Sequence, residues 1–240
     1  MKSITTSAST QRPSAVTVDY LGHCSFLWIT GEGVRVVIDP YRNNAAGNWF
    51  LRDFPAVEAD VVMTTHSHFD HDAAELVAGR PTTLRGPGRF QWRDIIIDGV
   101  ADLHARREGR EPLANVIFTV EVNGVRFCHM GDNRSGIAPE ALDAIGRVDV
   151  FMVNVDDSCH LLSFEEVEAV IQQLKPRIVV PMHYLIPGLT NPESTLETIQ
   201  GWLKSRPNIR EIETGPVSFS VDLLPVQQET WIMTPQLDKV

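Results

Sequence analysis

Cysteine is scarce in this sequence, with three residues in 240. Cys24, Cys128 and Cys159 lie far apart and form no Cys-x-x-Cys pair. Neither a disulfide framework nor a structural zinc site built from thiolates is therefore expected. We expect three free thiols, buried by default, in a reducing compartment, which points to the cytoplasm.

Long apolar runs and an excess of positive charge are lacking as well. No run approaches the roughly 18 residues of a membrane-spanning helix, so we expect no membrane partner. The net charge is −10, which leaves no broad cationic surface for nucleic acid. Residues 1–14 are rich in Ser and Thr and lack the apolar core of a secretory signal. We expect a disordered tail there.

The rest of the chain has an ordinary globular composition, 43% hydrophobic and 22% charged. It is long enough for a sizeable core and shows no repeat or linker, so we expect a single domain over 15–240. Strands at 16–21, 24–29 and 34–38 predict an antiparallel meander, and Asn123-Gly124 predicts a hairpin. Two apolar strands, 148–155 and 177–181, flank a helix and predict a βαβ unit. The sequence also predicts strands at 60–64, 115–122, 125–130 and 217–221, a helix at 73–78, a helix at 138–145, a helix capped at Ser163 and stopped by Pro176, and a helix after Asn191.

One segment is dense in metal ligands. Within seven consecutive residues it holds His66, His68, Asp70, His71 and Asp72. It follows a short apolar strand and turns toward the predicted helix. Residues two apart in extended backbone share a face, so two of the imidazoles can meet one ion while the later ligands reach a second. Imidazole nitrogen and carboxylate oxygen suit zinc, manganese or iron.

Further candidate ligands come later in the chain. His104 stands alone, Asp132 follows Gly131 at the end of a strand, and His183 ends the apolar strand 177–181. This order, after the His-x-His-x-Asp-His segment, resembles the metallo-β-lactamase superfamily. The resemblance is carried over residues 20–184 and implies an αββα sandwich, in which two mixed β-sheets pack face to face with helices on the outer faces.

The resemblance also implies a ligand set. His66, His68 and His104 would bind one divalent ion, Asp70, His71 and His183 the second, and Asp132 would bridge both. No tight motif surrounds His104, so His129, in the same strand as Asp132, is its rival for the first ion. His129 comes three residues before Asp132 and is expected to point elsewhere, so His104 is preferred. Asp72 would orient a histidine from the second shell or act as the first carboxylate of a helix. His23, at a strand break, is either a partner of a ligand or a turn residue.

Such a site points to hydrolysis. We expect two ions, zinc or manganese before iron. They would hold a shared hydroxide that attacks an ester, lactone, amide or phosphoester. Three motifs, at 20–26, 38–40 and 174–184, resemble the L-ascorbate-6-phosphate lactonase-like branch and, more distantly, N-acyl-phosphatidylethanolamine phospholipase D. In the lactonase-like branch, a glycine pair often follows the strand that matches 148–155. In this chain that strand is followed instead by Asp-Asp-Ser-Cys-His at 156–160, so the sequence departs from the branch here. Because relatives in that branch form oligomers, the resemblance also allows a homo-oligomer for this protein.

The departing segment ends at His160, which either binds substrate and protonates the leaving group or is a satisfied loop histidine. Asp70, Asp132 and His160 are thus the candidate catalytic residues. The long loop 41–55 is expected to face a small, anionic substrate. Arginines that could meet the anion are Arg42, Arg52, Arg106, Arg107 and Arg134.

Other functions remain open from the sequence. A diiron oxygen reductase on the same fold usually carries glutamate in place of His68, and a mononuclear-iron persulfide dioxygenase keeps the histidines. A nuclease of the same superfamily disagrees with the acidic balance. A metal-binding module without catalysis disagrees with the complete ligand set.

Overall fold

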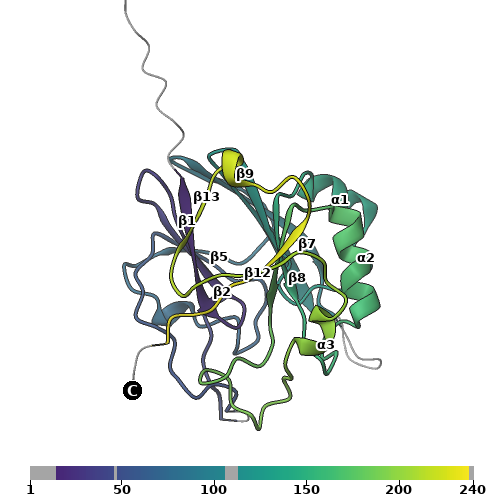
Figure 1. Cartoon of the computed structure of the whole chain (residues 1–240). Helices are drawn as coiled ribbons and strands as arrows, with labels where there is room; N and C mark the ends of the chain where they lie inside the picture. Colours follow the sequence, from purple (N-terminus) through teal and green to yellow (C-terminus); the bar gives the residue numbers. More distant parts are fainter. Residues whose placement is uncertain (1–14, 46–47, 106–112, 238–240) are drawn as a thin grey trace, which may run out of the picture.

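The computed structural model describes residues 15–45, 48–105 and 113–237. The predicted tail at 1–14 lies outside them. Two β-sheets pack face to face, with the larger helices on one outer side (Figure 1). The predicted αββα class of two mixed sheets is confirmed.

The first sheet has six strands in the order β13, β1, β2, β3, β4, β5. Their bounds are Val217–Phe219, Val16–Gly22, Ser25–Ile29, Arg35–Ile38, Val61–Met63 and Thr82–Leu84. Strands β1, β2 and β3 pair antiparallel, as the meander predicts, whereas β3, β4 and β5 run parallel. The carboxyl ends of β3 and β4 therefore meet at one edge.

The second sheet has eight strands in the order β12, β14, β11, β10, β9, β8, β7, β6. Their bounds are Ile209–Glu211, Glu229–Ile232, Ile178–Met182, Val150–Asn154, Val125–His129, Ala114–Val122, Ile95–Leu103 and Gly88–Trp92. Asn123 and Gly124 have φ of 51° and 77° and form the predicted hairpin. Strands β9, β10 and β11 are parallel, so their carboxyl ends also meet.

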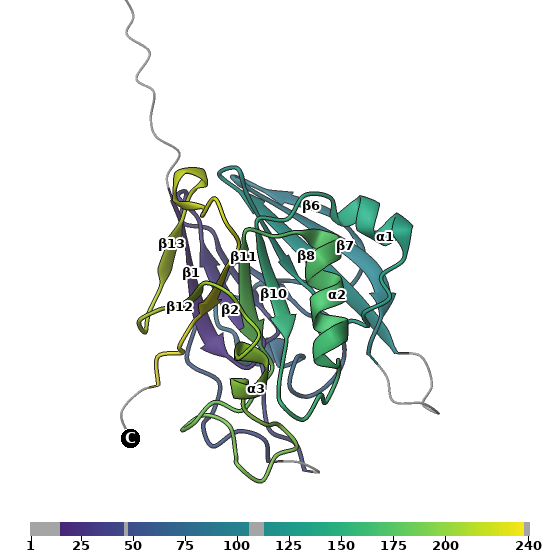
Figure 2. The same cartoon turned by 45° about the vertical axis from the view of Figure 1, so that its right-hand side comes forward.

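Helices α1 (Pro139–Ile145) and α2 (Phe164–Leu174) cover the outside of the eight-stranded sheet (Figures 1 and 2). The predicted capping box starts α2: Glu166 N donates to Ser163 Oγ at 3.2 Å, and Ser163 N donates to Glu166 Oε2 at 2.8 Å. Apolar side chains of α2 at helical spacing are buried against the sheet. This βαβ unit, β10–α2–β11, is confirmed by the parallel pairing of its strands.

The structure departs from the expected elements at three places. The helix expected at 73–78 is one 3₁₀ turn, η1 (Ala74–Leu76), because Ala73 offers no capping side chain and Ala78 N bonds to Val57 O instead. The helix expected after Asn191 shortens to α3 (Gln200–Leu203), since the backbone before it bonds to other loops, including Asn191 N to Trp49 O. After β13, where the sequence predicts no further element, the chain adds β14 to the second sheet, beside β11. The remaining short 3₁₀ turn is η2 (Val221–Leu223).

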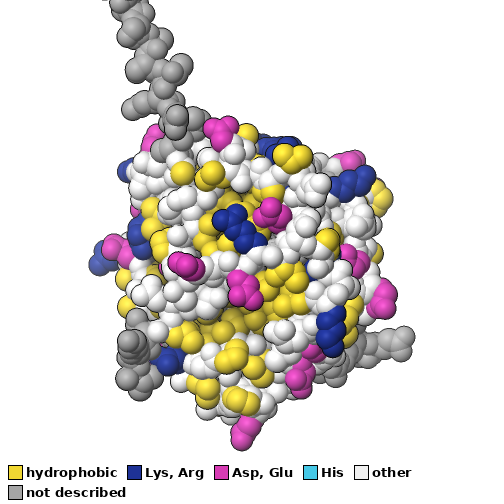
Figure 3. Space-filling view, in the orientation of Figure 1, with side chains coloured by type: hydrophobic (Ala, Val, Ile, Leu, Met, Phe, Trp, Pro, Cys, Tyr) yellow, Lys and Arg dark blue, Asp and Glu magenta, His cyan; other side chains and the backbone are white. Residues whose placement is uncertain are grey.

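The core lies between the two sheets and contains large aromatic side chains from both. Trp28 packs edge-on against Phe127 at 5.9 Å, and Phe219 packs against Trp231 at 5.3 Å between ring centroids. No helix in the described part of the chain has the length and apolarity to cross a bilayer. None of the eight histidines shows on the face drawn in Figure 3, where apolar side chains and scattered charges are seen instead.

Candidate metal centre

The ligand-dense segment leaves β4 and turns back on itself at the edge where β3 also ends. Asp39, directly after β3, holds this turn through its carboxylate. Thr65 N donates to Asp39 Oδ1 at 2.8 Å and Thr65 Oγ1 donates to Oδ2 at 2.7 Å. Within the turn, His71 N donates a hydrogen bond to His68 O at 3.0 Å. The turn therefore presents its histidines in a fixed arrangement.

The first ligand group brings together four side chains from separate parts of the sequence: His66, His68, His104 and Asp132. One ligand atom from each lies within 4.8 Å of the others. His66 Nε2 is 3.1 Å from His68 Nδ1, and His104 Nε2 is 3.3 Å from Asp132 Oδ2. His104 reaches the group because it forms an isolated β-bridge with Asn133, next to Asp132.

His129, the rival for the first ion, lies elsewhere. Its Nε2 donates to Cys24 O at 2.8 Å, and its Nδ1 accepts from Gly131 N at 3.1 Å. Its ring also packs edge-on against Phe26 in the core between the sheets. Both nitrogens are thus used by the backbone, and the geometry favours His104 as the ligand.

The second ligand group faces the first across Asp132. His71 Nε2 lies 3.3 Å from Asp132 Oδ1 and 3.5 Å from Asp70 Oδ2. His183 Nε2 lies 3.6 Å from Asp132 Oδ2 and 3.7 Å from Asp70 Oδ2. Asp132 stands between both groups, 3.6 Å from His66 Nε2 on the other side. Asp132 is thus in contact with side chains of both ligand groups.

Glycine is needed directly before Asp132. Gly131 has a φ of +55°, and a Cβ there would lie 2.6 Å from Asn115 Oδ1 and from Thr65 Cβ. A side chain would thus be strained and would clash with the turn that carries His66. The sequence signal for this feature was the Gly-Asp pair at the end of a strand.

Two residues that orient the ligands were not predicted from the sequence and come from neighbouring strand ends. Asp39 Oδ2 accepts from His71 Nδ1 at 2.8 Å, which leaves Nε2 of that ring to face the site. Asn154, at the end of β10, donates to Asp132 Oδ1 at 2.6 Å. Asp39 comes directly after β3, and Asn154 is the last residue of β10; both strands are apolar and lie next to β4 or β9. A polar residue at the end of an apolar strand next to a ligand-bearing strand was the sequence signal that could have found them.

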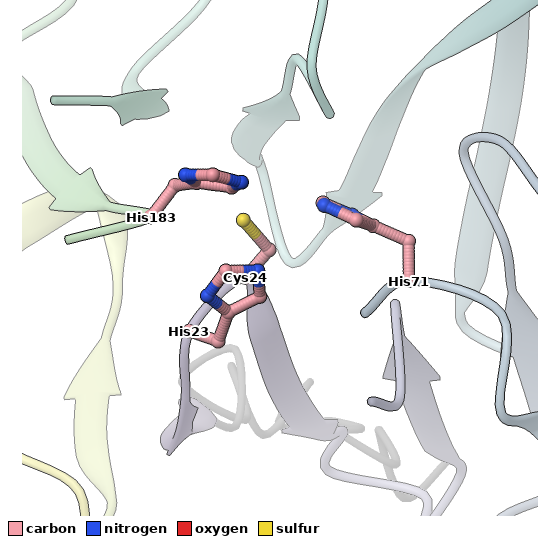
Figure 4. Close-up of side chains that lie close together, drawn as sticks. All are labelled: His23, Cys24, His71 and His183. Carbon is pink, nitrogen blue, oxygen red and sulfur yellow. The ribbon is translucent and has the colours of Figure 1, made fainter. Parts of the chain in front are cut away.

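His23 and Cys24 enter the site from the turn between β1 and β2 (Figure 4). His23 Nε2 is 3.0 Å from Asp70 Oδ2, so the structure places His23 against a candidate ligand. Of the two readings that the sequence left open, contact with a ligand is the one observed. The sulfur of Cys24 lies among the rings of His23, His71 and His183.

The two histidine groups differ in their electrostatic surroundings. Burial, with the charge of His71, lowers the pKa of His66 to about 3, and burial with the charge of His183 lowers that of His23 to about 4. Burial alone would also lower the pKa of His71, but the charges of Asp132, Asp70 and Asp39 raise it well above its ordinary value. Without a cation, His71 therefore carries a proton that balances the buried carboxylates.

The donor set fits divalent metal ions. Nε2 of His71 and Nε2 of His104 are buried and accept or donate no hydrogen bond, although both face Asp132. Unpartnered buried nitrogens are costly unless something satisfies them. Imidazoles and carboxylates converging on one point provide lone pairs for zinc or manganese.

Asp72 does not orient a histidine. Its carboxylate pairs with the Arg85 guanidinium, and its backbone N donates to His68 O at 2.9 Å. The predicted contact of Asp72 with an imidazole is therefore wrong, because its carboxylate pairs with Arg85 instead. The alternative as a helix carboxylate also fails, since only a 3₁₀ turn follows.

A pocket of about 320 Å³ opens beside the first ligand group. His104 and Arg134 form part of its wall, together with apolar and polar neighbours: Leu103, Ala105, Ser135, Leu161, Leu162 and Glu166. Arg134 is held in place by Asp102, with Nη2 2.7 Å and Nε 2.9 Å from Oδ1. Of the arginines considered from the sequence, this one lies beside the candidate centre.

The other candidate arginines are engaged elsewhere or not described. Arg42 Nη1 lies 2.9 Å from Glu75 Oε1, and Arg52 Nε donates to Gly188 O at 2.8 Å. Arg106 and Arg107 lie outside the described residues.

His160 and the loop 41–55 meet over the second ligand group. The His160 ring stacks on that of His183 at 5.7 Å between centroids, and Trp49 lies 5.7 Å away edge-on. The same indole packs edge-on against His23 and Phe69. The structure thus brings the segment 156–160 and the long loop 41–55 together beside the second ligand group.

Comparison with known proteins agrees with this geometry. Residues 17–183 match the family model described as the Beta-lactamase superfamily domain. The chain is 28% identical over 195 residues to a UPF0173 metal-dependent hydrolase of Thermococcus onnurineus, covering 70% of this chain and 84% of that protein. It is also 28% identical over 246 residues to a UPF0173 metal-dependent hydrolase of Anaeromyxobacter sp., with 84% and 86% covered.

A solved structure shares the fold. The chain superposes with a TM-score of 0.70 on a protein of Thermotoga maritima described as a proposed Zn-dependent hydrolase of the metallo-β-lactamase superfamily. The match covers 92% of this chain and 100% of that one at 24% sequence identity. It shows that the two sheets and their order are those of a known architecture.

Proposed function

The chain belongs to the metallo-β-lactamase superfamily as a metal-dependent hydrolase, and on that premise we propose that it uses two divalent ions to cleave an ester, lactone or phosphoester bond in a small anionic molecule. The superfamily predicted from the ligand order is confirmed by the match over 17–183. The lactonase-like branch, the choice of zinc or manganese and the use of two ions belong to the proposal.

The observation that carries the proposal is the position of Asp132 between the two ligand groups. One ion would be held by His66, His68 and His104, and the other by Asp70, His71 and His183. Asp132 touches both groups: its Oδ2 lies 3.3 Å from His104 Nε2, and its Oδ1 lies 3.3 Å from His71 Nε2. Two ions held here would supply Lewis-acid polarisation of the substrate and a lowered pKa for a water molecule between them.

The surrounding residues keep the ligands in register. His23 is neutral at pH 7 because its pKa is lowered to about 4, so its Nε2–H donates to Asp70. Asp39 accepts from His71 Nδ1 and thereby fixes the tautomer whose Nε2 lone pair faces the site. These contacts limit motion of the reacting groups, which is a requirement for efficient hydrolysis.

His160 is proposed to donate a proton to the leaving group. It lies half-buried above His183, beside Trp49, where a substrate bound to the second ligand group would touch it. Its loop is shaped by Asp156, whose Oδ1 accepts from Ser158 N at 2.8 Å. A histidine held at this edge can exchange protons with solvent between turnovers.

The size and lining of the pocket support a small substrate. A volume of about 320 Å³ is at the lower end for small-molecule sites. Arg134 contributes a positive charge next to His104, while Leu161 and Leu162 add apolar surface. An anionic group near Arg134 with a modest apolar part fits this wall.

Metal analysis followed by a substrate screen tests the proposal. The purified protein is expected to contain two zinc or manganese ions per chain and to hydrolyse members of a panel of phosphodiesters, lactones and sugar phosphates. A chelator should abolish turnover, and zinc or manganese should restore it. Turnover that survives thorough metal removal would reject the proposal, and one iron per chain with oxygen uptake would favour the redox alternative.

A further inference from the structure

The thiol of Cys24 lies beside two histidines of the second ligand group, His71 and His183. Its Sγ and one ring nitrogen from each of His23, His71 and His183 lie within 4.8 Å of one another. Figure 4 shows the sulfur between the rings of His183 and His71, with His23 in front of it. Cys24 is fully buried, and none of the predicted ligand roles uses it.

The backbone around Cys24 is clamped in place. His129 Nε2 donates to Cys24 O at 2.8 Å, and His183 N donates to His23 O at 3.1 Å. The turn also depends on Gly22, whose φ of +102° places a substituted Cβ 2.3 Å from Leu189 Cδ2. The sulfur is therefore held at one position relative to both histidines, so little conformational freedom is lost when it binds a ligand.

A second observation points to a ligand at this place. His71 Nε2 is fully buried and has no hydrogen-bond partner, because Asp39 engages only the opposite nitrogen. The unpartnered nitrogen faces the carboxylates and the region of the Cys24 sulfur. The imidazole nitrogen and the sulfur, with carboxylates beside them, are atoms that can bind a cation once His71 has lost its proton.

We propose that the Cys24 sulfur is a ligand of the second metal ion, together with His71, His183 and Asp70. This inference rests on the two-ion centre of the proposed function. On binding, the thiol loses its proton to solvent and the sulfur forms a bond to the cation, with no change of oxidation state. A thiolate donor makes this centre softer than the first, so it should prefer zinc, cadmium or cobalt to manganese.

Cobalt substitution tests the inference without relying on activity. A thiolate bound to Co²⁺ gives an intense near-ultraviolet charge-transfer band that imidazole and carboxylate ligands do not give. The metal-free protein is loaded with Co²⁺, and bound cobalt per chain is counted alongside the spectrum. The variants are Cys24→Ser, which exchanges sulfur for oxygen, and the double variant Cys128→Ser/Cys159→Ser, which leaves Cys24 as the sole thiol.

The expected result is two cobalt ions per chain and a band of equal intensity in the wild type and the double variant. Cys24→Ser should lose the band. Because the double variant keeps Cys24, the test remains decisive even if Cys24→Ser folds poorly. Two bound cobalt ions without the band would overturn the role of Cys24 and leave the hydrolase proposal intact. Fewer than two bound ions, with the band present, would contradict the two-ion centre and retain the sulfur ligand.

Discussion

Replacing Asp39 by asparagine should weaken the second metal centre without removing any ligand. Asp39 is fully buried, and its carboxylate accepts from Thr65 N, Thr65 Oγ1 and His71 Nδ1 at 2.7–2.8 Å. Asparagine keeps the shape but replaces one acceptor oxygen by an NH₂ group. The question is which partner then meets a donor.

The fixed backbone decides this orientation. Thr65 N is part of the main chain and must meet an oxygen, so the amide NH₂ turns toward His71 Nδ1. The imidazole then has to accept at Nδ1 and carry its proton on Nε2. That nitrogen is the one that faces Asp70 and Asp132, so its lone pair is no longer offered to a metal ion.

The size of the effect follows from similar outer contacts. Loss of a partner that orients a metal-bound histidine costs about 10–100-fold in affinity, which is about 1.4–2.7 kcal/mol. We expect this loss for the second centre and a smaller change for the first, because Asp39 reaches that group through Thr65, whose Oγ1 lies 3.0 Å from His66 Nδ1.

Titration calorimetry of the metal-free protein with zinc measures both affinities. Asp60→Asn is a matched control, because Asp60 is exposed and accepts from Arg35 N at 2.8 Å away from the ligands. Unchanged affinity of the second centre in Asp39→Asn, or equal weakening of both centres, would refute the tautomer argument. Circular dichroism checks that the variant retains its fold.

Three further predictions follow from the same site. Metal removal should lower the stability toward thermal unfolding, since a ligand at 1,000 times its Kd adds about 4.1 kcal/mol; equal melting temperatures with and without chelator would contradict coupling of metal and fold. The two centres should release different numbers of protons when metal binds. At pH 7 His66 of the first centre is already neutral, with a pKa of about 3. His71 of the second centre, whose pKa is raised well above its ordinary value, must lose a proton to bind the metal. Affinity of the second centre should therefore rise with pH more steeply, and calorimetry in buffers of different ionisation enthalpy should show more protons released there; equal release would count against it. His160→Ala should reduce kcat/KM by about 10²-fold or more with metal content unchanged, and unchanged kcat/KM on the true substrate would remove His160 from the mechanism.

Local sequence determined much of the architecture. The apolar segments 16–21 and 24–29 predicted β1 and β2, the Asn123-Gly124 pair fixed the hairpin between β8 and β9, and the capping box at Ser163 started α2. In each case the cause lies within a few residues of the feature, so tertiary contacts only had to agree with it. The short elements failed for the opposite reason: η1 and β14 are set by distant partners.

The candidate site divides in the same way. Spacing within one turn predicted His66, His68, Asp70 and His71 together, because neighbouring residues on one strand end cannot lie far apart. The sequence by itself therefore indicated a metal-binding segment, and its resemblance indicated the superfamily that the family match shows.

Only the tertiary structure decided which distant residues complete the centre. His104 and His129 are both strand-end histidines, and the order of strands in the second sheet sends one to Asp132 and the other into backbone hydrogen bonds. Likewise Asp39 and Cys24 reach the ligands because β1, β2, β3 and β4 are neighbours in the first sheet. Periodicity tells which face of a strand a side chain occupies, but what lies across from that face depends on how the two sheets are packed.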